Sequence, residues 1–303
     1  MRDAFSRCLV EAAKANPRII LLTGDHGYAL FDEFRRECSS QYVNAGVAEQ
    51  NMVGVAAGLA KVGFFPIVYG LNAFVPIRVL EQIKIDLCYE QLPALLIGDG
   101  AGVVYGQLGA SHQSTEDVAA LRSIPHVSIY SPADAVEMGW CFAEALAARN
   151  TCYLRMGKAD RGRVQGDNST PATGPIQLVD GAGGKTAFIA TGAMVKTALT
   201  LAEELRNIAV WSVPRLKPLE NDELDQCLVG TDKVVVFEEH SIRGGLGSIV
   251  AERMSEQRNA PVLCRIGVDD RFSELCGNYD YLIDWHGLSL RKSRDKVMAF
   301  LAA

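Results

Sequence analysis

The sequence lacks the marks of several protein classes. Its 8 cysteines include no Cys-x-x-Cys pair, and no histidine stands at the spacing of a metal ligand, so we expect no zinc site. The apolar runs are short and broken by glycine, proline or charge, which excludes a membrane-spanning helix. There is no basic stripe with interleaved aromatic residues. Together with a net charge of −6, this argues against a surface that binds nucleic acid or an anionic membrane.

The cysteines and the first residues predict a compartment. Several cysteines lie in apolar segments, where a free thiol packs as a small hydrophobic group. They are scattered along the chain, at positions 8, 38, 88, 141, 152, 227, 264 and 276. Residues 1–5 lack the apolar core of a signal peptide and are typical of a first helical turn. We therefore expect a reduced, cytoplasmic protein.

The composition predicts a globular protein of two domains, since the chain has 303 residues, of which 49% are hydrophobic and 22% charged. Apolar strands alternate with helices from end to end. This predicts an α/β fold in which each domain has a mostly parallel sheet with helices on both faces. The expected strands are residues 18–23, 65–69, 93–98, 126–130 and 152–155, followed by 186–192, 209–213, 233–237 and 261–266.

Helices are expected between these strands. Residues 75–89, 194–205 and 247–256 have helical patterns, and Ser131 before Pro132 predicts an N-cap followed by the first helical residue. Residues 157–175 are dominated by charged, polar, glycine and proline residues, which indicates a linker between domains. We place the first domain at residues 1–163, the linker at 164–180 and the second domain at 181–303.

Glu49 begins a helix made almost entirely of small and apolar residues. Such a helix has little polar surface, so we expect it to be buried, with room for another backbone or a ligand to approach closely. A buried carboxylate costs free energy unless it is paired, hydrogen-bonded or protonated. Glu49 is therefore a candidate functional residue. The alternative is an ordinary acidic residue in a first helical turn, where the helix dipole favours it.

Other polar residues follow the ends of expected strands, where ligands bind in open parallel sheets. His26 and Arg155 each follow such an end, and so does the glycine-rich segment 98–113, which carries His112. The segment lacks the Lys-Ser/Thr ending of a phosphate-binding P-loop, so we interpret it as a flexible loop that delivers His112. Alternatives stay open: His112 can be merely solvated, and Arg155 can be either an anion hook or half of a salt bridge.

With these residues in place, essentially the whole chain resembles the C-terminal two-thirds of a transketolase-type enzyme. The resemblance implies the pyrimidine-binding domain of a thiamin diphosphate enzyme followed by a transketolase C-terminal domain. The β-subunits of 2-oxoacid dehydrogenases and the deoxyxylulose-phosphate synthases share this architecture. The matching motifs are residues 46–52, the loop at Phe74, residues 109–113, Leu154 with Arg155, and residues 238–247.

The resemblance implies a cofactor site. Glu49 would hydrogen-bond N1′ of the cofactor's aminopyrimidine and so promote loss of the thiazolium C2 proton, because an apolar pocket favours proton sharing over free charge. Phe74 would stack on the pyrimidine ring, although a core aromatic under a loop is the ordinary interpretation of any phenylalanine. Leu71, Ile77 and Gln82 would complete the site. Transketolases have aromatic residues at the positions of Leu71 and Ile77, so the ring cage here is more aliphatic.

Substrate contacts are also implied. His112 and His26 would face the substrate, and Arg155 would bind a sugar phosphate or another anionic group. His240 is as well suited to subunit packing as to substrate contact. The family has an aspartate that contacts a substrate hydroxyl where this chain has Leu108. A deoxy, branched or otherwise more apolar donor, or a small acyl donor, therefore becomes plausible.

A partner subunit is implied by what the chain does not carry. The full-length enzymes have an N-terminal domain whose Gly-Asp-Gly motif, completed by an asparagine, holds Mg²⁺ and the diphosphate. Here Gly98-Asp99-Gly100 is followed by no asparagine over residues 101–140, and residue 1 falls close to the expected start of the pyrimidine-binding domain. We therefore expect a separately encoded diphosphate-binding subunit that supplies the Mg²⁺ ligands, in an α₂β₂ heterotetramer.

Three functions follow from these observations. The first is the small subunit of a split transketolase-like enzyme that transfers a two-carbon ketol unit between sugars or sugar phosphates. The second is a β-subunit of the 2-oxoacid dehydrogenase or deoxyxylulose-phosphate synthase type, which transfers an acyl unit. The third is a non-catalytic assembly subunit that retains the fold.

Overall fold

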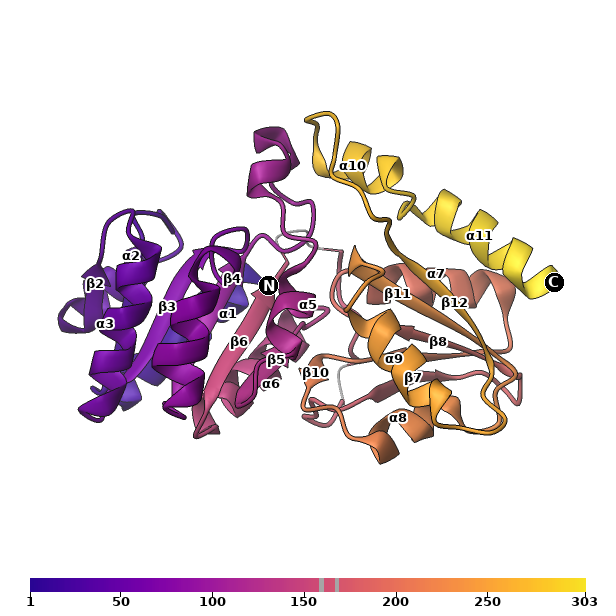
Figure 1. Cartoon of the computed structure of the whole chain (residues 1–303), viewed down its shortest axis with the longest axis horizontal. Helices are drawn as coiled ribbons and strands as arrows, with labels where there is room; N and C mark the ends of the chain where they lie inside the picture. The colour runs from indigo at the N-terminus through magenta and orange to yellow at the C-terminus, as the bar shows by residue number, and fades with distance from the viewer. Residues whose placement is uncertain (158–160, 167–168) are drawn as a thin grey trace.

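The computed structural model describes residues 1–157, 161–166 and 169–303, and its two sheets stand side by side (Figure 1). The first has seven strands in the order β10-β5-β6-β4-β3-β1-β2. The second has five, in the order β12-β11-β8-β9-β7. Every neighbouring pair is parallel except β10 with β5 and β7 with β9. The expected fold class is confirmed.

Helices cover both faces of the first sheet. Its strands are β1 (Ile19–Thr23), β2 (Tyr42–Asn44), β3 (Phe65–Leu71), β4 (Ala94–Asp99), β5 (Val127–Tyr130), β6 (Thr151–Met156) and β10 (Arg215–Lys217). On one face pack α1 (Arg2–Ala15), α2 (Asp32–Glu37) and α6 (Ala135–Ala147). On the other pack α3 (Glu49–Lys61), η2 (Ile77–Val79), η3 (Ile83–Tyr89) and α5 (Asp117–Arg122), with α4 (Leu80–Gln82) between η2 and η3.

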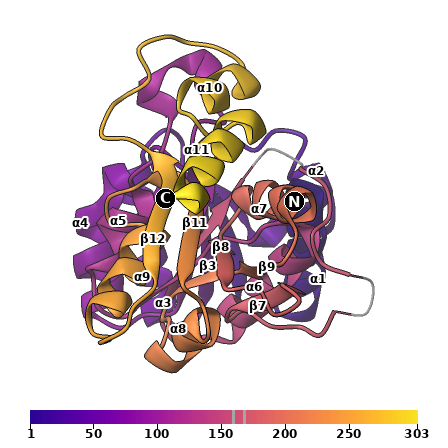
Figure 2. The same ribbon diagram turned by 90° about the vertical axis from the view of Figure 1, so that its right-hand side faces the viewer.

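The second sheet is built in the same way. Its strands are β7 (Ile176–Asp180), β8 (Thr186–Ala190), β9 (Ile208–Ser212), β11 (Lys233–Ser241) and β12 (Val262–Val268). α8 (Asn221–Leu228) and α9 (Leu246–Ser255) share a core with the first domain. α7 (Met194–Leu205), α10 (Tyr279–Trp285) and α11 (Leu290–Ala302) pack on the opposite face; Figure 2 shows α11 and the C-terminus from the outer end. No helix among the described residues is long and apolar enough to cross a membrane.

Three details differ from the sequence prediction. Residues 176–180 of the expected linker form β7, an antiparallel edge strand whose half-buried pattern carries no strong strand signal. Residues 158–160 and 167–168 of the expected linker region lie outside the described residues. Residues 75–89 do not form one helix but a 3₁₀ turn, a short α-turn and a π-helix. A π-helical segment is rare, and such segments are frequent at functional sites.

The third difference concerns the start of α6. Asp134, not Ser131, is the N-cap, and its side chain accepts hydrogen bonds from the backbone N–H groups of Val136 and Glu137. Ser131 does not begin the helix, and its backbone bonds to the second domain. Its N–H donates to the carbonyl of Pro214 at 2.6 Å, and its carbonyl accepts from the N–H of Gly192 at 3.1 Å.

A buried polar network joins the domains at the carboxyl end of β6. Asp117 is fully buried and accepts hydrogen bonds from Arg155 at 2.8 Å, Tyr153 at 2.6 Å and Asn72 at 3.0 Å. Arg155 also donates to the carbonyl of Glu239 in the second domain at 2.7 Å. Burial opposes the charge on Asp117, but Arg155 and these donors hold its pKa below the usual value. The network therefore depends on complete pairing, since removing one partner leaves a buried charge without compensation.

His240 of β11 is neutral in this network. Its Nε2 accepts from the N–H of Ala119 at 3.3 Å, so Nδ1 carries the proton and donates to the carbonyl of Ser241 at 2.7 Å. Burial lowers the pKa of His240 to about 4, against the attraction of Asp117, and Arg155 adds to the lowering. His240 is only 2% exposed, so it packs the domain junction and does not reach a ligand surface.

We expect His240 to make the protein sensitive to acid. Between pH 6.5 and 4 the unfolded chain takes up a proton here that the folded chain refuses, so stability falls as pH falls through that window. At pH 5 the loss is about 2 kcal/mol. Urea unfolding of the wild type and His240→Gln at pH 7.5 and 5 tests this, because the neighbouring Asp117, Glu238 and Arg155 remain in both. The wild type's advantage should shrink by that amount; an advantage independent of pH would contradict the assignment.

Candidate functional site

Glu49 is the first residue of α3 and is only 4% exposed. Its Oε2 lies 2.9 Å from an Nη1 donor of Arg78, whose own side chain is 44% exposed. Thus the carboxylate is inside and its cation closes the site from outside. The expectation that all of α3 is buried is wrong, because Asn51, Gly54 and Gly58 form an exposed face of small side chains in this chain alone.

Phe74 lies beneath the same guanidinium. The Cζ atom of Arg78 is 3.9 Å from the centre of the Phe74 ring, which is a cation–π contact. Phe74 follows β3 and its backbone N–H donates to the carbonyl of Leu71 at 2.8 Å, which fixes the loop that presents the ring. The ring of Phe74 and the carboxylate of Glu49 therefore contact one flat, positively charged group from two sides.

His112 reaches the same place from the glycine-rich loop. Its ring centre is 5.3 Å from that of Phe74, with an interplanar angle of 67°. Ser111 Oγ lies 3.0 Å from its Nδ1. The short 3₁₀ turn Ala110–His112 (η5) starts after Gly109, whose φ of +82° is a conformation that favours glycine. The predicted association of Glu49, Phe74 and His112 is thus present in the structure.

The second domain holds the loop that carries His112. The N–H of Val103 donates to Glu239 Oε1 at 2.9 Å, and Ser273 Oγ donates to Gln113 Oε1 at 2.6 Å. Gly102 has a φ of +69°, and a Cβ there would come within 2.1 Å of the Glu239 carboxylate. The loop is therefore braced at both ends, contrary to the flexible loop expected from its glycines.

The structure itself tests whether an aminopyrimidine would fit. The guanidinium of Arg78 shows that a planar group with N–H donors can lie on Phe74 and bond to Glu49. Arg78 also lines a hollow of about 700 Å³ together with Gln50, Ile77 and Gln82, which Glu49 and Phe74 do not line. The side-chain oxygen of Gln82 is buried and finds no hydrogen-bond partner among the described residues. The fit to the cofactor ring that the resemblance implies therefore rests on the ring face of Phe74 and the carboxylate of Glu49.

No metal site accompanies this pocket in the described part of the chain, where no group of three or more His, Cys, Asp or Glu side chains could hold an ion. Asp99 of the Gly-Asp-Gly segment is 1% exposed, and its Oδ2 accepts from Tyr69 at 2.7 Å and Tyr105 at 2.9 Å. Arg2 lies 3.6 Å from the same oxygen. This aspartate is engaged inside its own domain and not presented to a diphosphate.

Two predicted substrate ligands, His26 and Arg155, use their side chains in bonds within the protein. His26 Nε2 accepts from the N–H of Leu71 at 3.2 Å, so Nδ1 donates to the carbonyl of Gly24. Both ring nitrogens are therefore used in bracing the loop after β1 against the end of β3. Arg155 is 5% exposed and paired with Asp117. The structure supports the salt-bridge interpretation of Arg155, and a substrate contact by either side chain is not supported.

The sequence analysis does not include Arg78 among the site residues, although its spacing from Phe74 is a signal for the contact. It stands four residues after Phe74, and residues at this spacing lie on one face of a helical turn. An arginine near an aromatic residue and a buried acid is a recognisable combination only once the acid is placed. Glu49 is distant in sequence, so the pairing depends on the fold.

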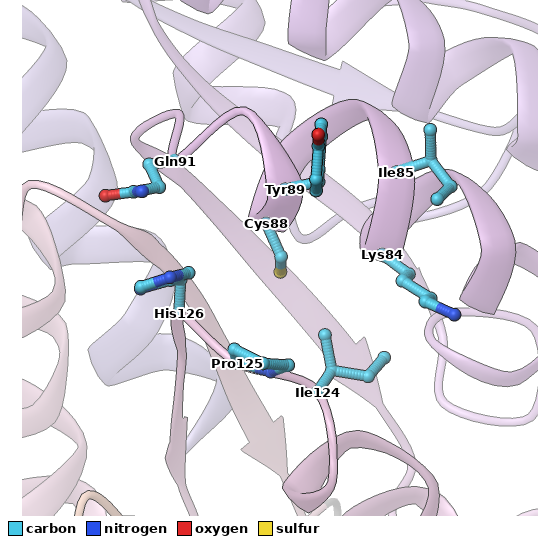
Figure 3. Close-up of a pocket in the computed structure, with 8 residues that line it drawn as sticks. All are labelled: Lys84, Ile85, Cys88, Tyr89, Gln91, Ile124, Pro125 and His126. Carbon is cyan, nitrogen blue, oxygen red and sulfur yellow. The ribbon is translucent and has the colours of Figure 1, made fainter.

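A second hollow of about 330 Å³ lies between η3 and the segment before β5 (Figure 3), and it shares Lys84, Ile85, Ile124 and Pro125 with the cavity beside Arg78. The Cys88 sulfur points toward it, with Ile124 and Pro125 opposite. Burial raises the pKa of Cys88 to about 11, so its thiol is protonated at neutral pH and a weak nucleophile. None of the predicted site residues lines this hollow.

Comparisons with known proteins identify the family of the chain. Two family models match, "Transketolase, pyrimidine binding domain" over residues 1–162 and "Transketolase, C-terminal domain" over residues 177–288. The chain is 34% identical over 298 residues to the 6-deoxy-6-sulfo-D-fructose transketolase subunit SqwH of Clostridium sp. (strain MSTE9), covering 96% of this chain and 91% of the relative. It is also 34% identical over 295 residues to a subunit of the apulose-4-phosphate transketolase of Phocaeicola vulgatus, covering 95% and 93%.

A solved structure resembles the whole chain. It is described as a split gene transketolase, an inactive beta4 tetramer, and it is 32% identical. The match covers 98% of this chain and 96% of the solved chain, with a TM-score of 0.87. The chain therefore belongs to the transketolase family, as a subunit of the split type that combines the pyrimidine-binding and C-terminal domains.

Proposed function

We propose that this chain supplies the aminopyrimidine-binding half of a thiamin diphosphate site, in an enzyme that transfers a two-carbon ketol unit between sugar substrates. The observation that carries the proposal is the pair of Phe74 and Glu49, which already binds a flat cation between a ring face and a nearly buried carboxylate. When bound, thiamin diphosphate supplies the nucleophilic carbon that takes up the ketol unit.

The chain's own residues have distinct roles in this proposal. Glu49 bonds to the ring nitrogen and shares a proton with it, in the place that the N–H donor of Arg78 takes in this structure. Phe74 supplies a stacking face. Leu71 and Ile77, both half-buried, form an aliphatic wall. Gln82 offers its unpartnered oxygen as an acceptor for an amino group.

His112 is proposed as the group that moves or holds a proton at a substrate oxygen. It is half-buried and its ring lies edge-on to Phe74, so it can reach a molecule that lies beside the stacked ring. Leu108, which is 55% exposed, precedes it on the same loop. The apolar side chain of Leu108 favours a donor that has no hydroxyl where it faces this side chain. One relative is named for a 6-deoxy-6-sulfo sugar.

A separately encoded partner is proposed to hold Mg²⁺ and the diphosphate, because diphosphate charge requires a metal or strong dipoles to neutralise it. The exposed small-residue face of α3 is a suitable contact for it, since glycine permits close approach of a second backbone. The resembling split-gene subunit is described as inactive when it forms a tetramer of its own kind. We propose an α₂β₂ assembly, and a cytoplasmic location because all eight cysteines are free.

Glu49→Gln should strongly reduce turnover while leaving the fold intact. In the reconstituted enzyme we expect kcat to fall roughly 100- to 10,000-fold, the range for loss of general acid–base help. The matched control is Glu203→Gln on the exposed part of α7, which should keep full activity. Steady-state kinetics with a ketose phosphate donor measures both. Full activity of Glu49→Gln would refute the catalytic assignment and favour an assembly role.

His112→Gln should act on the substrate step alone. We expect kcat to fall roughly 100-fold or more, whereas the affinity for thiamin diphosphate stays within about twofold because His112 meets the ring of Phe74 only edge-on. His126→Gln, in the hollow of Figure 3, is the control. Cofactor titration and single-turnover kinetics separate the two effects. A variant that lost cofactor binding but not turnover at saturation would overturn this role.

Cofactor binding should depend on the partner. The chain alone, with thiamin diphosphate and Mg²⁺, should bind on the order of 100-fold more weakly than the reconstituted complex, because the charge-assisted bonds to the diphosphate are missing. Isothermal titration with and without the partner measures this difference. Tight 1:1 binding by the chain alone would show that the diphosphate site lies within it.

A further inference from the structure

Arg78 makes both contacts that the proposed function assigns to the aminopyrimidine. Its guanidinium carbon is 3.9 Å from the centre of the Phe74 ring, and its Nη1 donates to Glu49 Oε2 at 2.9 Å. Like the aminopyrimidine, a guanidinium is planar, stacks on aromatic faces and presents several N–H donors in one plane. The two groups therefore require the same space, the same ring face and the same acceptor.

The electrostatics explain why Arg78 lies there. Glu49 is 4% exposed, and a carboxylate in such a position is costly unless a cation or strong donors compensate it. Among the described residues, Glu49 forms its ion pair with Arg78. The side chain of Arg78 comes from the outside, with 44% of it exposed. It therefore compensates the buried charge while keeping a path to solvent.

Arg78 also has somewhere to move. It lies in the short 3₁₀ turn η2, next to the cavity of about 700 Å³ that Gln50, Glu81 and Gln82 help to line. Glu81 is exposed and stands three residues after Arg78, a spacing at which acidic and basic side chains pair on a helical turn. A guanidinium displaced from Glu49 would thus find another carboxylate without a change in the backbone.

We propose that the space between the Phe74 ring and the Glu49 carboxylate is a binding site for flat cations with N–H donors. In the free chain the guanidinium of Arg78 occupies this binding site, and the aminopyrimidine must displace it. The inference rests on the proposed function, because this binding site is also the proposed site of the cofactor's aminopyrimidine. It adds that Arg78 lowers cofactor affinity in the free chain and keeps Glu49 paired until cofactor arrives. Arg78 is thus a specificity-determining residue: a ligand binds only if it replaces both of its contacts.

The test uses the isolated chain and thiamin, which has the aminopyrimidine but no diphosphate. Arg78→Met removes the charge and the donors but keeps the aliphatic stem, so thiamin should bind at least about tenfold more tightly than to the wild type. Arg78→Gln, a milder change, should move in the same direction. The matched control is Arg35→Met, since Arg35 is likewise over a ring, 5.6 Å from Tyr42, on an exposed helix. It should leave thiamin binding unchanged.

Benzamidine, a flat amidinium cation, tests the class of ligand. It should bind Arg78→Met, compete with thiamin there and bind the wild type more weakly. Adding Phe74→Ala or Glu49→Gln to Arg78→Met should remove the gain for both probes. Circular dichroism and thermal unfolding identify any variant that fails to fold, and Arg78→Gln then carries the comparison.

Two outcomes separate this inference from the function on which it rests. If Glu49→Gln is inactive in the reconstituted enzyme but Arg78→Met and Arg78→Gln bind thiamin no better than the wild type, the function stands and the role of Arg78 is wrong. If both Arg78 variants bind thiamin and benzamidine more tightly while Glu49→Gln keeps full turnover, the binding site between Phe74 and Glu49 exists but is not the catalytic site.

Discussion

A nearly buried carboxylate at the head of α3 is the constraint around which the first domain is arranged. Glu49 cannot remain charged in an apolar surrounding without a partner, and the structure provides one that is flat, cationic and placed on an aromatic ring. The rest of α3 divides between a buried side with Met52, Val53, Ala56 and Ala57 and an open side with Gly54 and Gly58.

The second domain contributes rigidity to the same site. Glu239 accepts from the N–H of Val103 and Ser273 donates to Gln113, so the second domain fixes both ends of the loop that carries His112. Hydrogen bonds and ion pairs between buried polar groups specify geometry more sharply than apolar contacts do. The guanidinium of Arg155 is engaged at the domain junction, where it donates to Asp117 and to the carbonyl of Glu239.

The strands were predictable because fully buried apolar runs leave a strong signal, as in β4 and β6, whose residues are all buried. β7 and β10 were not, because both are short antiparallel edge strands with mixed exposure, and β10 joins a sheet whose other strands lie far earlier in the chain. The sequence could place Glu49, Phe74 and His112 near one another because each follows the carboxyl end of a strand at the same edge of the sheet. Composition alone could not reveal that one face of α3 is exposed in this chain. A helix of small apolar residues has the same composition whether its own chain or another chain buries it.

The most direct test is the position of three side chains in a crystal structure of the reconstituted enzyme with thiamin diphosphate and Mg²⁺. The account predicts that the Glu49 carboxylate is within hydrogen-bonding distance of N1′, that Phe74 stacks on the ring, and that the Arg78 guanidinium has left both. A structure in which the cofactor is bound while Arg78 still pairs with Glu49 would contradict it.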